Sequence, residues 1–136
     1  MNEIALPVEQ AAELRARLTR EESGLVAKLS GTADLRVTDS VEAILGRVHQ
    51  TALELSIPEV RMDLRELEFM NSSCFKSFVS WISEVSDLTA GQYRIRFLSN
   101  PSILWQRRSL HALSCFAAEL VTIDAGHREH LEHEEL

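Results

Sequence analysis

Two neighbouring segments specify the fold most clearly: Val60-Arg61-Met62-Asp63-Leu64 and, after two charged residues, Leu67-Glu68-Phe69-Met70-Asn71-Ser72-Ser73-Cys74-Phe75. In the first segment apolar residues alternate with charged ones, which predicts a strand with one buried and one polar face. The second segment leads through a short loop into a helix, whose apolar stripe is Phe75, Phe78, Val79, Ile82 and Val85. Because the start of a helix has unpaired amides and a partial positive charge, this loop is suited to an anion or a phosphorylated hydroxyl.

The residues before this stretch predict a hairpin. Leu14–Thr19 and Leu25–Leu29 read as short strands on either side of a polar turn at residues 21–24, and Gly31 with Thr32 ends the second one. The first strand has an alternative, since Ala11-Ala12-Glu13-Leu14 also has good helix propensity.

A first helix is predicted between the hairpin and the central strand. Asp39, with Glu42 three positions later, is typical of a capping box at a helix start. Pro58 closes the pattern. The predicted buried face consists of Val41, Ile44, Leu45, Val48, Ala52 and Leu55.

The residues after the central stretch predict a strand, a helix and a last strand. Gly91 is expected to end the second helix, Ile95 and Phe97 alternate with arginines, and Asn100-Pro101 is expected to start a third helix. Leu120–Ile123 reads as the last strand. The buried side of the third helix is predicted to be Ile103, Leu110, Leu113 and Phe116.

The order of elements predicts an α/β fold, in which a mixed β-sheet is layered with α-helices. With 136 residues, the chain is expected to form a single domain over residues 1–136, with a core at about 14–123 and an acidic tail at 126–136.

A net charge of −7 and a pI near 5.2 argue against binding of nucleic acid. We expect a cytoplasmic protein with no membrane association, because the sequence has no long apolar run and no secretory signal. Cys74 and Cys115 are therefore expected to be free thiols.

Most of the chain resembles the STAS domain family, in the order of its elements from about Leu14 to Ile123 and in two shorter motifs. The strand with an acidic residue at Asp63 and the string Phe69-Met70-Asn71-Ser72-Ser73 look like its central segment, and Leu29–Leu35 looks like its Leu-x-Gly-x-x-Asp turn. Asn71 stands where the family typically has aspartate, and Cys74 stands where it has glycine.

The resemblance implies a regulatory protein similar to bacterial anti-sigma-factor antagonists, not an enzyme, that takes part in signal transduction and transcription regulation. In that branch, a partner that is both a serine kinase and an anti-sigma factor phosphorylates a serine or threonine at the position that Ser73 occupies here. The neighbouring Ser72 is the second candidate for phosphorylation. The partner would bind the loop and helix at residues 71–85, which include Asn71, Cys74, Phe75 and Lys76. A homodimer is also left open.

Three alternatives to a phosphorylation switch remain. Asn71 and Ser72 could merely cap the helix, and the protein could be a phosphorylation-independent scaffold or sensor subunit of the same fold. Cys74 could sense oxidants, because a thiol in the first turn of a helix can have a lowered pKa, but a small residue packed beneath the loop is the preferred interpretation. A small hydrolase that uses Cys74 or Ser73 is a third class.

No cofactor or metal is predicted. The five glycines are too scattered for a phosphate-binding loop, and His49 and His111 are isolated from any triad pattern. His127, His130 and His133 recur every third residue, but nothing near them completes a metal site, so a solvated acidic tail is the preferred interpretation.

Overall fold

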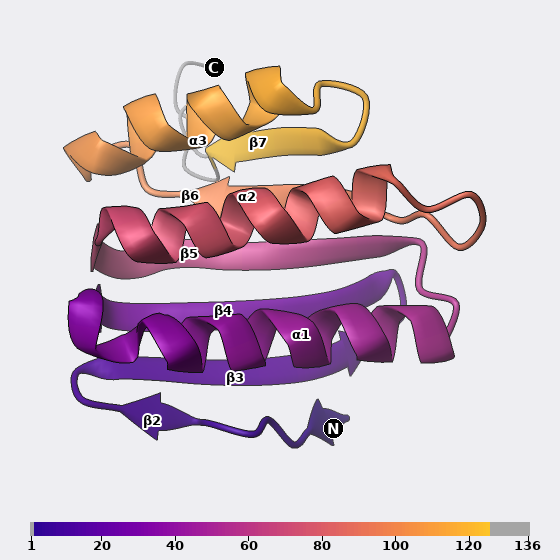
Figure 1. Cartoon of the computed structure of the whole chain (residues 1–136), viewed down its shortest axis with the longest axis horizontal. Coiled ribbons are helices and arrows are strands. Elements are labelled where there is room, and N and C mark those ends of the chain that lie inside the picture. Colours follow the sequence, from indigo (N-terminus) through magenta and orange to yellow (C-terminus); the bar gives the residue numbers. More distant parts are fainter. Residues whose placement is uncertain (1, 126–136) are drawn as a thin grey trace, which may run out of the picture.

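The computed structural model describes residues 2–125 (Figure 1). The predicted tail, with His127, His130 and His133, lies outside the described residues. The elements, in chain order, are β1 (Glu3–Ile4), β2 (Gln10–Ala11), β3 (Leu14–Glu21), β4 (Gly24–Ala33), the 3-10 helix η1 (Leu35–Val37), α1 (Thr38–Glu54), β5 (Glu59–Met70), α2 (Ser72–Ser86), β6 (Arg94–Ser99), α3 (Leu104–Phe116) and β7 (Val121–Ala125).

The strands form one mixed sheet in the order β1-β3-β4-β5-β6-β7, with β2 also paired to β3. β3 and β4 are antiparallel, whereas β4, β5, β6 and β7 are parallel neighbours joined by helices. Right-handed crossovers between sequential parallel strands place all the helices on one face of the sheet (Figure 1). The predicted α/β fold is confirmed, and so is the initial hairpin.

The N-terminal edge of the sheet differs from the prediction. β1 and β2 have two residues each, too few to give a recognisable period, and both pair with β3. β4 does not end at Gly31 but continues to Ala33. Gly31 has φ of +91°, and a Cβ at this position would collide with the backbone of Glu13, so this glycine permits two backbone segments to approach closely rather than ending the strand.

All three helices have a boundary that the sequence placed wrongly. α1 begins at Thr38 with no side-chain cap, so the predicted capping box of Asp39 and Glu42 does not form. α2 ends at Ser86, before Gly91, and α3 begins at Leu104.

Each of the two wrong helix starts has a local cause. Asp34 caps η1 instead, by accepting a hydrogen bond from the amide of Arg36 at 2.9 Å. Asn100 accepts a hydrogen bond from the amide of Ser102 at 2.9 Å within a turn that precedes α3. In both places a side chain that could cap a helix closes a shorter turn.

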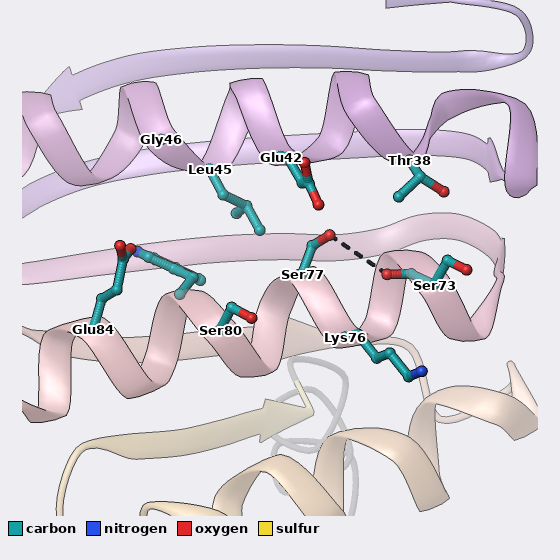
Figure 2. A pocket seen from close by; sticks show the side chains of 10 residues that line it. Thr38, Glu42, Leu45, Gly46, Ser73, Lys76, Ser77, Ser80 and Glu84 are labelled. Carbon is teal, nitrogen blue, oxygen red and sulfur yellow. Dashed lines mark hydrogen bonds between the residues drawn. The ribbon is translucent and has the colours of Figure 1, made fainter.

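The core lies between the sheet and the helices, where α1 and α2 lie side by side (Figures 1 and 2). Trp81 of α2 belongs to this core and is only 2% exposed. Its indole N–H donates to the hydroxyl of Tyr93 at 2.9 Å, and that hydroxyl lies 2.6 Å from Nδ1 of His49. Phe116, predicted to be buried, is 54% exposed.

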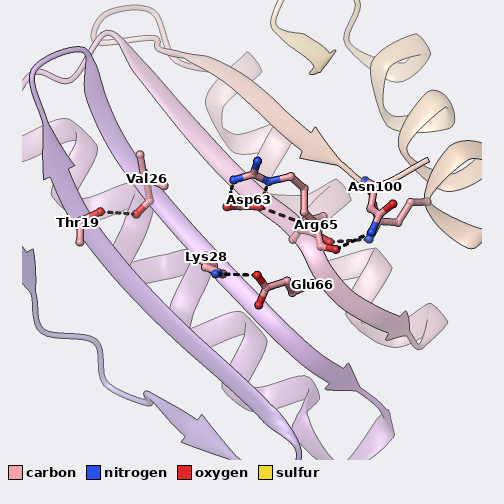
Figure 3. Close-up of polar contacts among 9 residues, drawn as sticks. Thr19, Val26, Lys28, Asp63, Arg65, Glu66 and Asn100 are labelled. Atoms are coloured by element: carbon pink, nitrogen blue, oxygen red, sulfur yellow. Dashed lines mark hydrogen bonds and ion pairs between the residues drawn. The ribbon is translucent and has the colours of Figure 1, made fainter. Parts of the chain in front are cut away.

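The other face of the sheet carries paired charges (Figure 3). Lys28 contacts Glu66 at 3.1 Å, and Arg65 contacts Asp63 at 2.8 Å. A chain of ion pairs also crosses strands β5 to β7, through Glu59, Arg96 and Asp124. Most of the charge on this face is therefore neutralised within the molecule.

Candidate functional site

The start of α2 lies at the edge where the parallel strands β4 and β5 end (Figure 1). Only Asn71 separates β5 from α2, and its backbone amide donates to the carbonyl of Ala33 at 2.7 Å. Its side-chain oxygen accepts a hydrogen bond from the amide of Ser73 at 2.7 Å, which caps the helix. The predicted loop is thus a single residue, whose backbone amide and side chain are both hydrogen-bonded.

The predicted site residues differ from one another in how far their side chains are exposed. Ser72 is exposed and Ser73 is half-buried; neither side chain caps α2, so the capping role predicted for Ser72 belongs to Asn71 alone. Phe75 is half-buried and Lys76 is exposed. The hydroxyls therefore lie at the positive end of a helix, with the one at Ser72 more open to another molecule.

Cys74 does not belong to the outer surface. Its side chain is fully buried, with Sγ 3.6 Å from the carbonyl oxygen of Asp34 and 3.8 Å from Oγ1 of Thr38. Burial raises the pKa of the Cys74 thiol, the opposite of what a reactive cysteine needs. Cys74 is thus a packing residue between α2 and the start of α1, and its burial speaks against both a contact with a partner and a reactive thiol. Cys115 is exposed, and both cysteines are free thiols as predicted.

A second turn lies beside the first one. Asp34 follows β4 as Asn71 follows β5, and its carboxylate pairs with the guanidinium of Arg36 at 2.7 Å. Hydrogen bonding from the Arg36 side chain holds the pKa of Asp34 below its ordinary value. The end of β4 and the turn at Asp34 therefore reach the same edge of the sheet as Ser72 and Ser73.

Exposed apolar side chains frame this edge. Leu35 in η1 is 67% exposed, Phe69 at the end of β5 is 46% exposed, and Leu104 at the start of α3 is 76% exposed. We call these three residues the apolar rim. The sequence predicts no such surface: its only signal is three large apolar residues beside predicted element ends, a pattern equally typical of the core.

The start of α3 is fixed against β5, which holds Leu104 in place. Gln106 is fully buried, and its Nε2 donates to the carbonyls of Leu64 at 2.6 Å and Leu67 at 3.0 Å. The neighbouring Trp105 donates from Nε1 to the carbonyl of Glu68 at 2.9 Å. The register between β4 and β5 shifts in this region, and these hydrogen bonds provide partners for carbonyl groups of β5 there.

A groove runs from Ser73 along the two helices α1 and α2 (Figure 2). Its volume is about 510 Å³. The residues that line it are Thr38, Glu42, Leu45 and Gly46 of α1 and Ser73, Lys76, Ser77, Ser80, Trp81 and Glu84 of α2. The groove is open to solvent along the two helices rather than enclosed within the core.

The described residues provide few parts for catalysis. Within residues 2–125, no three His, Cys, Asp or Glu side chains are grouped to hold a metal. In the same part of the chain, the hydrogen bonds of Ser73 and Cys74 involve no histidine. No helix among the described residues has the length and apolar character needed to span a membrane.

Comparison with known proteins identifies the fold. No family model and no curated protein sequence matches the chain. An anti-sigma factor antagonist from Mycobacterium paratuberculosis is similar with a TM-score of 0.63 and 15% identity, over 93% of this chain and 97% of its own.

SpoIIAA, an anti-sigma factor antagonist, is also similar. Its unphosphorylated form gives a TM-score of 0.55 at 18% identity, over 88% of this chain and 97% of its own. The phosphorylated form of the Bacillus protein gives a TM-score of 0.53 at 16% identity, over 87% of this chain and 97% of its own. The chain therefore has the STAS-like fold of these proteins, which confirms the predicted resemblance in fold.

Proposed function

We propose that this STAS-like domain is a regulatory, protein-binding module of the anti-sigma-factor-antagonist kind, not an enzyme. Its partner is a serine kinase that also acts as an anti-sigma factor. This partner binds the surface that residues 71–85 and the apolar rim form on the domain. The observation that carries this proposal is the position of Ser72 and Ser73 at the N-terminus of α2, next to exposed Leu35 and Phe69. Exposed apolar side chains beside a modifiable hydroxyl are typical of a regulated protein interface.

Phosphorylation of Ser73 is the proposed switch. A phosphoryl group adds about −1.5 to −2 charges at neutral pH, and the N-terminus of a helix stabilises added negative charge. The phosphorylated domain therefore stays folded. The partner would be released because charge and bulk are added where it contacts the helix.

Ser72 is the second candidate for modification. It is the more exposed of the two hydroxyls, whereas Ser73 lines the α1–α2 groove. A kinase that requires an extended, accessible residue would favour Ser72. Site mapping by mass spectrometry separates the two serines.

A phosphorylation-independent scaffold is the alternative function. The side chain of Asn71 is engaged in capping, and an amide supplies no carboxylate that could orient a neighbouring hydroxyl. Such a scaffold would bind the same partner whatever residue stands at position 73.

A pull-down from lysate of the source cells tests the switch. Wild-type protein, Ser73→Ala and Ser73→Asp serve as baits, and Ser23→Asp, in the exposed turn at the far end of the hairpin, is the matched charge control. We expect Ser73→Ala to retain a kinase-type partner that Ser73→Asp loses, while the control behaves like wild type. The captured kinase with ATP should then add one phosphoryl group to the wild type, seen by intact-mass spectrometry. Identical partners for all baits would favour the scaffold.

A further inference from the structure

We infer that the groove between α1 and α2 binds a helical segment of the protein partner, and that the contacting face of this segment carries arginine or lysine. The inference rests on the proposed function and deepens it, because it states the chemistry of the partner surface that reaches Ser73. It is carried by the shape of the groove and by its charge.

The dimensions of the groove suit a helix. From Ser73 to Glu84, α2 advances about 16 Å, which is about three turns. Because α1 and α2 lie side by side over this length, a third helix can lie along the depression between them (Figure 2). One end of the seated helix would then touch Ser73.

The side chains of the groove leave its wall clear. Gly46 lies in the middle of α1, where glycine lowers helix stability relative to alanine. A Cβ at Gly46 would meet no atom within 4 Å, so no contact within the described residues requires a glycine there. On the facing helix, Ser77 and Ser80 are small. A partner backbone can therefore approach closely at this point.

The charge of the groove selects the partner. Glu42 comes from α1 and Glu84 from α2, and their side chains reach into the space between the helices (Figure 2). Neither carboxylate has an ion-pair partner within residues 2–125, in contrast to the paired charges on the open face of the sheet. Lys76 lies at the Ser73 end with its side chain directed away from α1. Two unpaired carboxylates facing one groove complement a basic helix.

NMR titration with defined peptides tests the inference. The probe is an alanine-based helix of about 20 residues with arginines along one face, and its matched control carries glutamates at the same positions. We expect the arginine peptide to shift the amide signals of Gly46, Ser77 and Ser80 in the ¹⁵N-labelled protein. The glutamate peptide should leave them unchanged.

Three variants of the protein make the test specific. Glu42→Gln with Glu84→Gln should weaken binding of the arginine peptide about fivefold, since two exposed charge pairs are removed. Glu22→Gln with Glu119→Gln removes the same charge from exposed positions outside the groove and should change binding less than twofold, about the level of non-specific attraction. Gly46→Met should abolish the shifts while the melting temperature rises, which separates blocking of the groove from unfolding.

Each other outcome overturns the inference. These outcomes are shifts confined to another surface, equal shifts with the glutamate peptide, equal weakening by both double variants, or no shift with either peptide. Because the titration needs neither kinase nor phosphorylation, its failure would leave the result for the Ser73 baits standing. A failed pull-down would likewise leave the groove measurement intact.

Discussion

The sulfur of Cys74 lies 3.6 Å from the backbone carbonyl oxygen of Asp34, so the first turn of α2 packs directly on the turn that follows β4. Here a buried side chain fills the space between the two turns that form the candidate site.

Cys74→Gly should lower the free energy of unfolding by about 2 kcal/mol, because it leaves a cavity and places glycine in a helix. Urea denaturation followed by circular dichroism measures the change. Cys115→Ser, at an exposed position, should differ from wild type by less than about 0.5 kcal/mol. A loss of stability as small at Cys74 would contradict the packing role.

Asn71→Ala should cost about 1 kcal/mol of stability, since it removes the cap on the amide of Ser73. Asn71→Asp retains an acceptor and adds a negative charge at the helix N-terminus, so it should be at least as stable as wild type. Ser72→Ala serves as the control and should have almost no effect, because Ser72 is exposed and does not cap the helix. Thermal unfolding of the three variants ranks them; equal losses at positions 71 and 72 would argue for shared capping.

The same substitution should have opposite effects at two glycines. Gly46→Ala should stabilise the protein by up to about 1 kcal/mol, because the site is helical and open. Gly31→Ala should destabilise it by more than that, since φ is +91° and the added Cβ would collide with the carbonyl of Glu13. Denaturant midpoints provide the comparison, and a destabilised Gly46→Ala would show that the groove wall is tighter than described.

Tyr93 should ionise only when the protein unfolds. Burial raises its pKa, so above the ordinary tyrosine value of about 10 the unfolded state loses the proton while the folded state retains it, and stability falls as pH rises. Tyr93 is the only tyrosine, so absorbance at 295 nm reports on it alone. We expect one cooperative alkaline step that coincides with loss of the circular dichroism signal. Ionisation before unfolding would contradict the buried contact with Trp81.

Asp63 should make the fold sensitive to acid. Burial acts to raise the pKa of Asp63, but hydrogen bonds from the side chain and amide of Arg65 outweigh it, so the pKa lies below the ordinary value. Its stabilisation is therefore present above about pH 4 and is lost as pH falls through the lower, folded-state pKa. Asp63→Asn should be less stable at pH 7 and should lose less stability between pH 5 and acid, as measured by urea midpoints across pH. Parallel pH profiles for both proteins would contradict this.

The sequence supported the architecture well because the deciding features were local. Alternation in residues 60–64 and the helical stripe after Ser73 each specify an element and its buried face, and the short connections specify the topology. The helix starts were harder, since Asp34 caps η1 ahead of α1, and Asn100, the expected start of the third helix, closes a turn before α3.

The site was only partly predictable for a different reason. The hydroxyls of Ser72 and Ser73 belong to one local motif, whereas the apolar rim joins three segments that meet only in the folded chain. The burial of Cys74 likewise depends on Asp34 and Thr38, both far away in sequence. Pattern within one segment contains no information on such contacts.

The single-residue connection at Asn71 has a kinetic consequence. With its amide and side chain both engaged, little backbone ordering of this chain is needed when another protein binds there, so this side of the interface is preformed. Changes at this surface should then be expressed mainly in how long the complex lasts rather than in how fast it forms.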